Sequence, residues 1–264
     1  MIKIESSHVL VTGGNRGIGE AIAEEALRRG AMVTIAARVP NHPDYRSTRD
    51  RFTQSYPGKV NWLTLDLADR QSIESTKSYF EANAVDILVN NAGLLTGGLL
   101  EKQSTDEVYA MFQVNLVGLT HLTQIALPPM LERRRGIIVN NSSVSGVMNF
   151  PLASTYSAAK TGVMALSRCL QAELKGTGVR CMVAVTPGVK TRMFDEIPKK
   201  YGEHLDLSFM QSSVTPESWA KNIFDALERG EDEVLPAGAT RLGVGLAQHF
   251  PGLFGRIVAA KFKR

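Results

Sequence analysis

Short apolar runs rich in β-branched residues alternate along the chain with longer stretches in which apolar residues recur every three or four positions. The short runs have the length of strands, and the longer stretches have the period of amphipathic helices. We predict strands at 8–12, 32–37, 60–65, 85–90, 136–141, 179–185 and 232–236. We predict helices near 17–29, 45–55, 70–83, 104–133, 155–175 and 215–230.

Continuous apolar strands that alternate with helices favour a parallel sheet whose two faces are both covered. The expected fold class is therefore α/β, with a doubly wound parallel sheet of seven strands and helices on both faces. The sequence contains no linker-like composition, repeat or low-complexity segment, and the strand rhythm continues to Pro236. We expect residues 1–264 to form one domain.

Composition narrows the class of protein. The sequence is 44% hydrophobic and has no apolar run near the ~20 residues of a membrane span. It begins with a strand-like run and not with the apolar stretch of an export signal, so we expect a cytoplasmic protein. Cys169 and Cys181 lack metal-ligand and disulfide-rich spacing, so we expect both to be reduced and structural, with no metal site.

The net charge of +4 is concentrated near the end of the sequence, where residues 237–264 form a tail beyond the last predicted strand. From Val234 onward there is no acidic residue, and the bases are Arg241, Arg256, Lys261, Lys263 and Arg264. Because the body lacks a net positive charge and any nucleic-acid module, we expect no nucleic-acid partner.

Apolar residues recur at helical spacing among the bases of segment 251–264, which predicts a short basic amphipathic helix. Two interpretations are open. The helix could lie on anionic lipid and give weak peripheral membrane contact, or it could dock on a neighbouring subunit.

After the first predicted strand the sequence reads VTGGNRGIG, in which glycines with the spacing G-x-x-x-G-x-G open a helix. Glycines let the backbone turn sharply and approach a pyrophosphate, whose charge the amides of a helix N-terminus can meet. A loop that only closes a tight turn is the alternative. The predicted dinucleotide-binding residues of this turn are Gly13, Asn15, Arg16, Gly17, Ile18 and Gly19.

The end of the second strand is where such folds contact the adenosine ribose. An acid there favours NAD, whereas an arginine accommodates the 2′-phosphate of NADP. This sequence has Ala37 and Arg38 at that place, and Arg16 in the glycine turn could supply a second guanidinium. The predicted cofactor is NADP(H), unless both arginines are only solvated surface residues.

Tyr156 and Lys160 are four residues apart, so a helix would place both side chains on one face. A neighbouring cation favours the phenolate and lowers the pKa of a tyrosine. Tyr156 could then act as an acid or a base. For the pair alone, an ordinary exposed helix is the alternative.

Together, these motifs resemble the short-chain dehydrogenases/reductases of the compact type, whose fold is Rossmann-like. The resemblance covers Val9 to about Pro236. The motifs that carry it are TGGNRGIG, Asp66-Leu67 after the third strand, NNAG at 90–93, Asn115, Ser143 with Tyr156 and Lys160, and Pro187-Gly188.

The resemblance implies further cofactor contacts to the adenine and its ribose, at Asp66, Leu67, Asn91, Ala92 and Gly93. The motif at 90–93 could instead be a strand-ending turn. At the nicotinamide end the resemblance implies contacts from Pro187, Gly188 and Thr191. The family usually has three residues between that glycine and the threonine, whereas this chain has only Val189 and Lys190, so the loop is one residue short.

The resemblance also implies a catalytic set. Tyr156 would pass a proton to the substrate oxygen, and Lys160 would hold the nicotinamide ribose and lower the pKa of Tyr156. Ser143 would polarise the same oxygen, with Ser142 as the competing choice. Asn115 would hold a water that links Lys160 to solvent, or would be a buried asparagine that caps or kinks its helix.

The sequence thus predicts an NADP(H)-dependent oxidoreductase that interconverts a carbonyl and a secondary alcohol. An NADP(H)-binding regulatory or scaffold protein with little turnover is the alternative. Residues 192–214 fall where the family has a substrate lid, and helices 104–133 and 155–175 would pair in a homodimer or homotetramer. An apolar small-molecule substrate is one interpretation of the apolar residues Leu94, Met148, Phe150, Leu152, Met193, Phe194, Phe209 and Met210. The alternative is that these residues only pack the lid.

Overall fold

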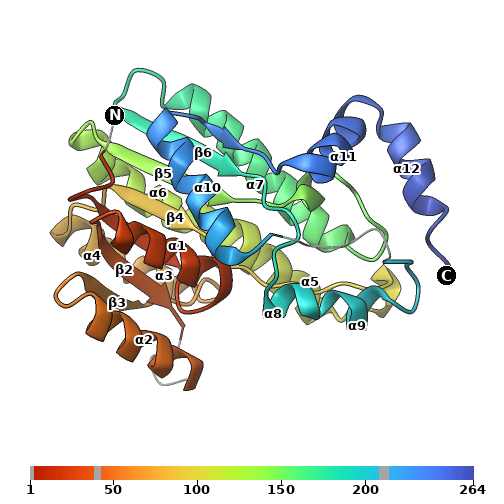
Figure 1. Ribbon diagram of the computed structural model, residues 1–264, viewed down its shortest axis with the longest axis horizontal. Coiled ribbons are helices and arrows are strands. Elements are labelled where there is room, and N and C mark those ends of the chain that lie inside the picture. The colour runs from red at the N-terminus through yellow and green to blue at the C-terminus, as the bar shows by residue number, and fades with distance from the viewer. Residues whose placement is uncertain (1–2, 39–42, 208–213) are drawn as a thin grey trace.

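A seven-stranded parallel sheet runs through the computed structural model, which describes residues 3–38, 43–207 and 214–264 (Figure 1). The strand order is β3-β2-β1-β4-β5-β6-β7, and every neighbouring pair is parallel. The predicted doubly wound α/β fold is therefore confirmed. The strands are β1 (His8–Thr12), β2 (Met32–Ala37), β3 (Val60–Thr64), β4 (Ile87–Asn90), β5 (Gly136–Asn141), β6 (Val179–Ala184) and β7 (Glu233–Val234).

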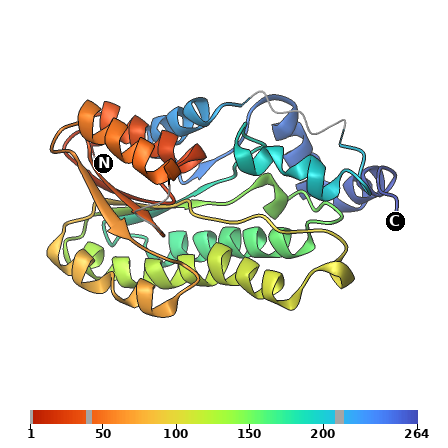
Figure 2. The same cartoon turned by 90° about the horizontal axis from the view of Figure 1, so that it is seen from below.

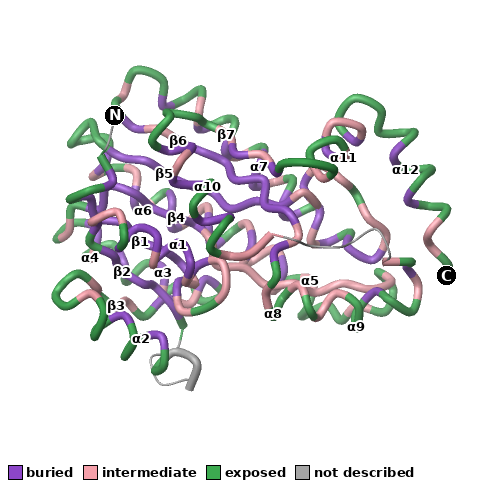
Figure 3. Tube along the Cα trace, in the orientation of Figure 1, coloured by how far each residue is buried: buried purple, intermediate pink, exposed green. Residues whose placement is uncertain are grey.

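Helices cover both faces of the sheet (Figure 2). One face is packed by α1 (Gly17–Arg28), α2 (Pro43–Ser55) and α10 (Pro216–Arg229). The other is packed by α3 (Arg70–Glu74), α4 (Lys77–Ala82), α6 (Gly118–Glu132) and α7 (Ser154–Glu173). The strands β1, β2, β4, β5 and β6 are buried over most of their length (Figure 3), which explains why they read as continuous apolar runs. The edge strand β3 is only partly covered.

Two predicted helices are interrupted. The predicted helix 70–83 is divided into α3 and α4 at Ser75 and Thr76, and the Thr76 hydroxyl donates to the carbonyl of Ile73 at 2.7 Å. The predicted helix 104–133 consists of α5 (Thr105–Phe112), the π-helical segment η2 (Gln113–Val117) and α6. Its start is as predicted, since Ser104 forms a capping box with Glu107. A π-helical segment inside an α-helix is often found at a functional site.

The tail differs from its prediction. It forms two helices, α11 (Gly238–His249) and α12 (Pro251–Ala259), where the sequence predicted one. Glycines at three of the twelve positions of α11 hide its helical period. Within the described ranges, no helix has the length and apolar character needed to span a membrane.

The predicted lid contains α8 (Arg192–Asp195) and α9 (Ile197–Tyr201), while Phe209 and Met210 lie outside the described residues. Two short 3-10 turns, η1 (Leu100–Lys102) and η3 (Val144–Gly146), precede α5 and follow β5. Cys181 is buried, and burial raises the pKa of its thiol to about 12. Cys169 is exposed on α7, so the expected structural role for it is wrong.

Candidate active site

The glycine turn between β1 and α1 has a conformation that other residues would not allow. Gly13 and Gly17 have φ angles of +65° and +57°, in the left-handed region. A Cβ added to Gly19 would overlap the carbonyl oxygen of Gly13 and lie 2.5 Å from Asn91 Nδ2. The turn is joined to the end of β2 by a hydrogen bond of 2.7 Å from Gly13 N to Ala36 O. The result is a cradle of backbone at the carboxyl ends of the strands.

The residues of this cradle fit a dinucleotide phosphate. Arg16 is the N-cap residue of α1, and its side chain makes no cap hydrogen bond. The first amides of α1 can therefore face an anion. Arg16 and Arg38 are both exposed beside the cradle. Asn15 is held through its carbonyl oxygen, which accepts a 3.1 Å hydrogen bond from Thr48, and Ile18 packs against the core.

Asp66 and Leu67 form a turn after β3. Asp66 Oδ1 accepts a hydrogen bond of 2.9 Å from Ala68 N, and Asp66 N donates to Ser72 Oγ at 2.9 Å. The buried Leu67 accepts a bond of 3.1 Å from Gln113 Nε2 through its carbonyl oxygen. The turn is thereby fixed against the π-helical segment η2.

A chain of hydrogen bonds crosses the carboxyl ends of β1, β4, β5 and β6. Asn91 donates from Nδ2 to Thr12 O at 3.1 Å and accepts from Asn141 Nδ2 at 2.9 Å. Asn141 Oδ1 accepts from the hydroxyl of Thr186, which in turn accepts from Trp219 Nε1 at 3.0 Å. Sequence reasoning missed Asn141, Thr186 and Trp219. The signal was the repeated Asn-Asn pair at the ends of β4 and β5.

Ser143 and Tyr156 lie together beyond β5. The Ser143 hydroxyl lies close enough to the phenol to lower the pKa of Tyr156 in part, and Ser143 Oγ accepts a hydrogen bond from Ser145 N at 3.1 Å. Ser142 is turned away, since its hydroxyl donates to the backbone oxygen of Lys160 at 2.8 Å. Of the two serines, the structure therefore brings Ser143 to the phenol.

Lys160 lies on the same face of α7 as Tyr156, and its Nζ is 5.8 Å from the centroid of the tyrosine ring. The ammonium is buried and donates to Asn141 O at 2.9 Å. Burial lowers the pKa of Lys160 to about 8, because an ammonium loses hydration there.

The pKa of Tyr156 is raised, which contradicts the predicted lowering. Burial is the larger cause, and the nearby Ser143 hydroxyl opposes it only in part. The spacing of Tyr156 and Lys160 predicted their shared face correctly. It could not predict that the ammonium would bind the backbone of β5 and lie beside the ring.

Asn115 is fully buried in η2. Its Nδ2 donates to Leu94 O at 3.0 Å and to Met111 O at 3.1 Å, while Oδ1 accepts from Leu94 N at 3.3 Å. A Cβ added to Gly93 would lie 2.6 Å from Asn115 Oδ1 and 3.8 Å from Lys160 Nζ. The asparagine therefore stabilises the irregular helix and also lies close to the lysine.

The loop after β6 brings Thr191 to the glycine turn. Pro187 is buried, and Gly188 lies so close to Phe194 that an added Cβ would be 2.5 Å from its ring. Thr191 caps α8 by accepting a 3.3 Å hydrogen bond from Phe194 N. A Cβ added to Gly17 would lie 3.6 Å from the methyl group of Thr191. The shortened loop thus still reaches the cradle.

One residue of the lid enters the site without a sequence signal. Tyr201, at the end of α9, is 4% exposed and donates to Thr96 O at 3.3 Å. Its pKa is raised, mainly by burial and further by the charge of ionised Tyr156. The phenol of Tyr201 thus joins the lid to the loop after β4 at Thr96.

The fold and this arrangement define the class of the protein. A family model described as short chain dehydrogenase matches residues 7–202. The chain belongs to this family, and it is an oxidoreductase of the short-chain dehydrogenase type. The resemblance drawn from the motifs is thereby confirmed.

Two curated relatives have more specific names. The chain is 33% identical over 205 residues to 3-oxoacyl-(acyl-carrier-protein) reductase FabG of Thermotoga maritima, covering 76% of this chain and 82% of the relative. It is also 33% identical over 235 residues to 3-dehydrosphinganine reductase TSC10B of Arabidopsis thaliana. That match covers 87% of this chain and 70% of the relative.

Solved structures share the fold over nearly the whole chain. A short-chain dehydrogenase from Streptomyces avermitilis is similar with a TM-score of 0.80 and 27% identity, covering 97% of this chain and 96% of that one. A closed form of serine dehydrogenase complexed with NADP+ is similar with a TM-score of 0.73 and 26% identity. That match covers 88% of this chain and 97% of the serine dehydrogenase chain.

Proposed function

We propose that this protein is an NADP(H)-dependent oxidoreductase that interconverts a carbonyl and a secondary alcohol. The observation that carries the proposal is the pair of adjacent hydroxyls from Ser143 and Tyr156 above the buried ammonium of Lys160. Two hydroxyls can hold one carbonyl oxygen, and a cation beside the phenol can stabilise the charge that remains after proton transfer. Both relatives named above are called reductases.

In the reducing direction, Ser143 orients and polarises the carbonyl oxygen of the substrate. Tyr156 donates its phenolic proton to that oxygen, and the positive charge of Lys160 stabilises the resulting phenolate. The raised pKa of Tyr156 suits this role, because it keeps the phenol protonated until the substrate is bound. Asn115, next to Lys160 across Gly93, holds the water through which the lysine and tyrosine regain a proton.

The glycine cradle would hold the pyrophosphate of the cofactor, and the exposed Arg16 and Arg38 would bind a 2′-phosphate, which favours NADP(H) over NAD(H). The similar serine dehydrogenase structure is a complex with NADP+. When bound, NADPH supplies the hydride for the carbonyl carbon. The proposed cofactor contacts beyond the cradle are Asp66, Leu67, Asn91, Ala92, Gly93, Tyr156, Lys160, Pro187, Gly188 and Thr191.

The proposed substrate is a 3-oxo compound with an aliphatic part. The names of the two relatives describe reduction of a 3-oxoacyl and a 3-dehydro compound. In this chain, the lid and the loops under it form one apolar cluster. Its members include Leu99, Phe150, Leu152, Ile197, Tyr201 and Leu205.

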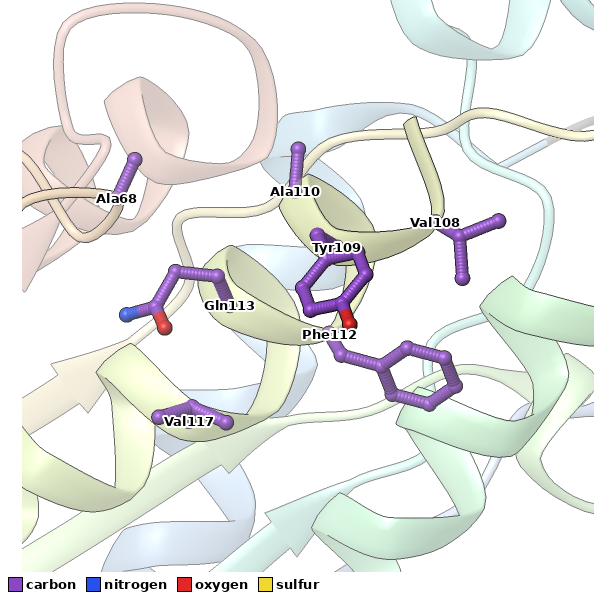
Figure 4. Close-up of a pocket in the computed structure, with 7 residues that line it drawn as sticks. All are labelled: Ala68, Val108, Tyr109, Ala110, Phe112, Gln113 and Val117. Carbon is purple, nitrogen blue, oxygen red and sulfur yellow. The ribbon is translucent and has the colours of Figure 1, made fainter. Parts of the chain in front are cut away.

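We also propose that the protein is a cytoplasmic homodimer or homotetramer. The outer face of α5 exposes 74% of Tyr109, and Val117 in η2 is 49% exposed. These two residues border a shallow hollow of about 470 Å³ that Val108 and Phe112 also line (Figure 4). An apolar face of this kind is suited to burial against a second copy.

The direct test is NADPH oxidation with a panel of carbonyl compounds that includes 3-oxo esters of increasing chain length. Removing the acid in Tyr156→Phe should lower kcat by about 10²–10⁴-fold. NADPH affinity should change much less, because only one of the proposed cofactor contacts is lost. The matched control is Tyr109→Phe, which removes an exposed phenolic hydroxyl from α5 and should leave kcat unchanged. Full activity of Tyr156→Phe would overturn the mechanism. Tight NADPH binding with no turnover on any carbonyl would favour the regulatory alternative.

A further inference from the structure

The helix α12 contacts the rest of the protein through few buried side chains. Only Phe254 and Val258, one helical turn apart, are buried among its nine residues. They pack on the loop after β5, where the rings of Phe150 and Phe254 are 5.9 Å apart. An isolated helix of this length is only marginally stable in water, so further burial would stabilise it.

The two tail helices and the residue between them expose large apolar side chains. Leu253 and Ile257 are 52% and 45% exposed on α12, and Phe250, which precedes that helix, is 61% exposed. On α11, Leu242 is 77% exposed. Figure 3 shows that α12 is mostly exposed and that both helices project from one end of the molecule. We call this the tail face, defined by Leu242, Phe250, Leu253 and Ile257.

The charged side chains that the two tail helices carry have one sign. Arg241 and Arg256 are exposed on the same two helices, and the sequence has no acidic residue after Val234 to balance them. Two further bases are joined to the body instead, since Lys261 pairs with Asp206 at 3.0 Å and Arg264 with Glu101 at 2.6 Å. An apolar face bordered by cations matches the interface of an anionic membrane.

From these observations we propose that the tail face docks on the surface of an anionic lipid membrane. A second copy of the chain is a poorer partner for this face. A symmetric contact would bring the arginines of both copies together without an acid from either tail. Lipid headgroups supply the missing negative charge, and the acyl boundary accepts the leucine, isoleucine and phenylalanine side chains.

Docking in this orientation would bring the lid to the membrane. The chain after α12 pairs with the lid through an antiparallel bridge between Phe262 and Leu205. Hydrogen bonds run from Asp206 N to Lys261 O at 3.0 Å and from Lys263 N to His204 O at 2.8 Å. The strands β4 to β6 also point toward the end of the molecule that carries the lid and the tail helices (Figure 1). The docking itself does not depend on the proposed reaction.

The test uses the full chain in flotation with phosphatidylcholine vesicles, either pure or containing phosphatidylglycerol. We expect binding to the anionic vesicles only, with a binding constant that falls as salt rises. The double change Leu253→Asp and Ile257→Asp should weaken binding more than tenfold. Arg256→Gln should weaken it about fivefold, the effect of one base near an anionic surface.

Leu131→Asp is the matched control, because Leu131 is 37% exposed on α6, outside the tail face, and its change should leave vesicle binding intact. NADPH affinity, measured for every variant, reports that the fold is retained. Tyr156→Phe should bind vesicles like the wild type, so failure of the reaction and failure of docking are distinguishable. The proposal is overturned if the full chain ignores anionic vesicles at low salt. It is also overturned if the Leu253→Asp and Ile257→Asp changes leave vesicle binding intact but alter the molecular mass measured by light scattering, because the tail face would then join copies of the chain.

Discussion

The two halves of the active site are built by different means. On the side of β1 to β3, the site consists of backbone shaped by glycines and of exposed guanidinium groups. On the side of β5 and α7, it consists of side chains that are wholly or largely buried and joined by hydrogen bonds. In the proposed function, the first half binds the cofactor by shape and charge, and the second half controls proton transfer. Changes in the first half should therefore alter cofactor affinity, and changes in the second should alter the rate of the chemical step.

The largest expected effect in this comparison comes from the exposed arginines. Arg16→Ala combined with Arg38→Asp should weaken NADPH binding at least ~100-fold, because each charge-assisted hydrogen bond contributes about 1.5–3 kcal/mol. NADH binding should change much less, and kcat at saturating cofactor should be retained. Fluorescence titration with each cofactor measures this, with Arg168→Ala on α7 as a control that removes an exposed arginine elsewhere. A wild type that already prefers NADH would contradict the role of the arginines.

A smaller effect is expected where shape alone matters. Gly19→Ala should weaken NADPH binding by about 10- to 100-fold, since relieving an overlap of this kind costs typically 1–3 kcal/mol. Gly14→Ala is the matched control in the same turn. Its added Cβ would be no closer than 3.2 Å to its neighbours, and Gly14 does not have a positive φ. Equal losses of NADPH affinity for the two variants would show that the close contacts around Gly19 are not the reason why glycine is needed there.

The smallest effect concerns the half of the site on the side of β5 and α7. Because the pKa of Lys160 is lowered to about 8, its charge is lost as pH rises through that value. The reducing kcat/KM should then fall, at most tenfold per pH unit, while NADPH affinity changes less. A rate that stays constant to pH 10 would separate Lys160 from the proton transfer.

The same shift has a defined sign for stability. The unfolded chain binds more protons than the folded one between about pH 8 and the ordinary lysine value of 10.5. The burial of the Lys160 charge therefore lowers the free energy of unfolding by its full amount below pH 8. The free energy of unfolding should rise as pH increases from 8 to 10.5. Denaturant unfolding of the wild type and Lys160→Met across this range measures that difference.

Local sequence patterns predicted the sheet well because each strand is a continuous apolar run between turns. They also predicted that Tyr156 and Lys160 share a helix face, because that spacing is local; the roles of these residues and of Ser143 stay predictions. They could not show that Trp219 reaches the site through Thr186 and Asn141, since that chain of bonds depends on strand register. The pKa of Tyr156 was predicted in the wrong direction, because burial depends on the whole fold.

The position of β4 next to β1 has a consequence for how the chain reaches this structure. Strands β1 to β3 and strands β4 to β7 are each continuous in sequence, and only the β1–β4 pairing joins the two groups. That pairing closes a long loop, so it is expected to form late and slowly during folding. Asn91 crosses this seam by donating to Thr12 O, and it accepts from Asn141 Nδ2 on the β5 side. The cofactor cradle is therefore complete only after the two half-sheets have docked, and a bound dinucleotide holds them together by mass action.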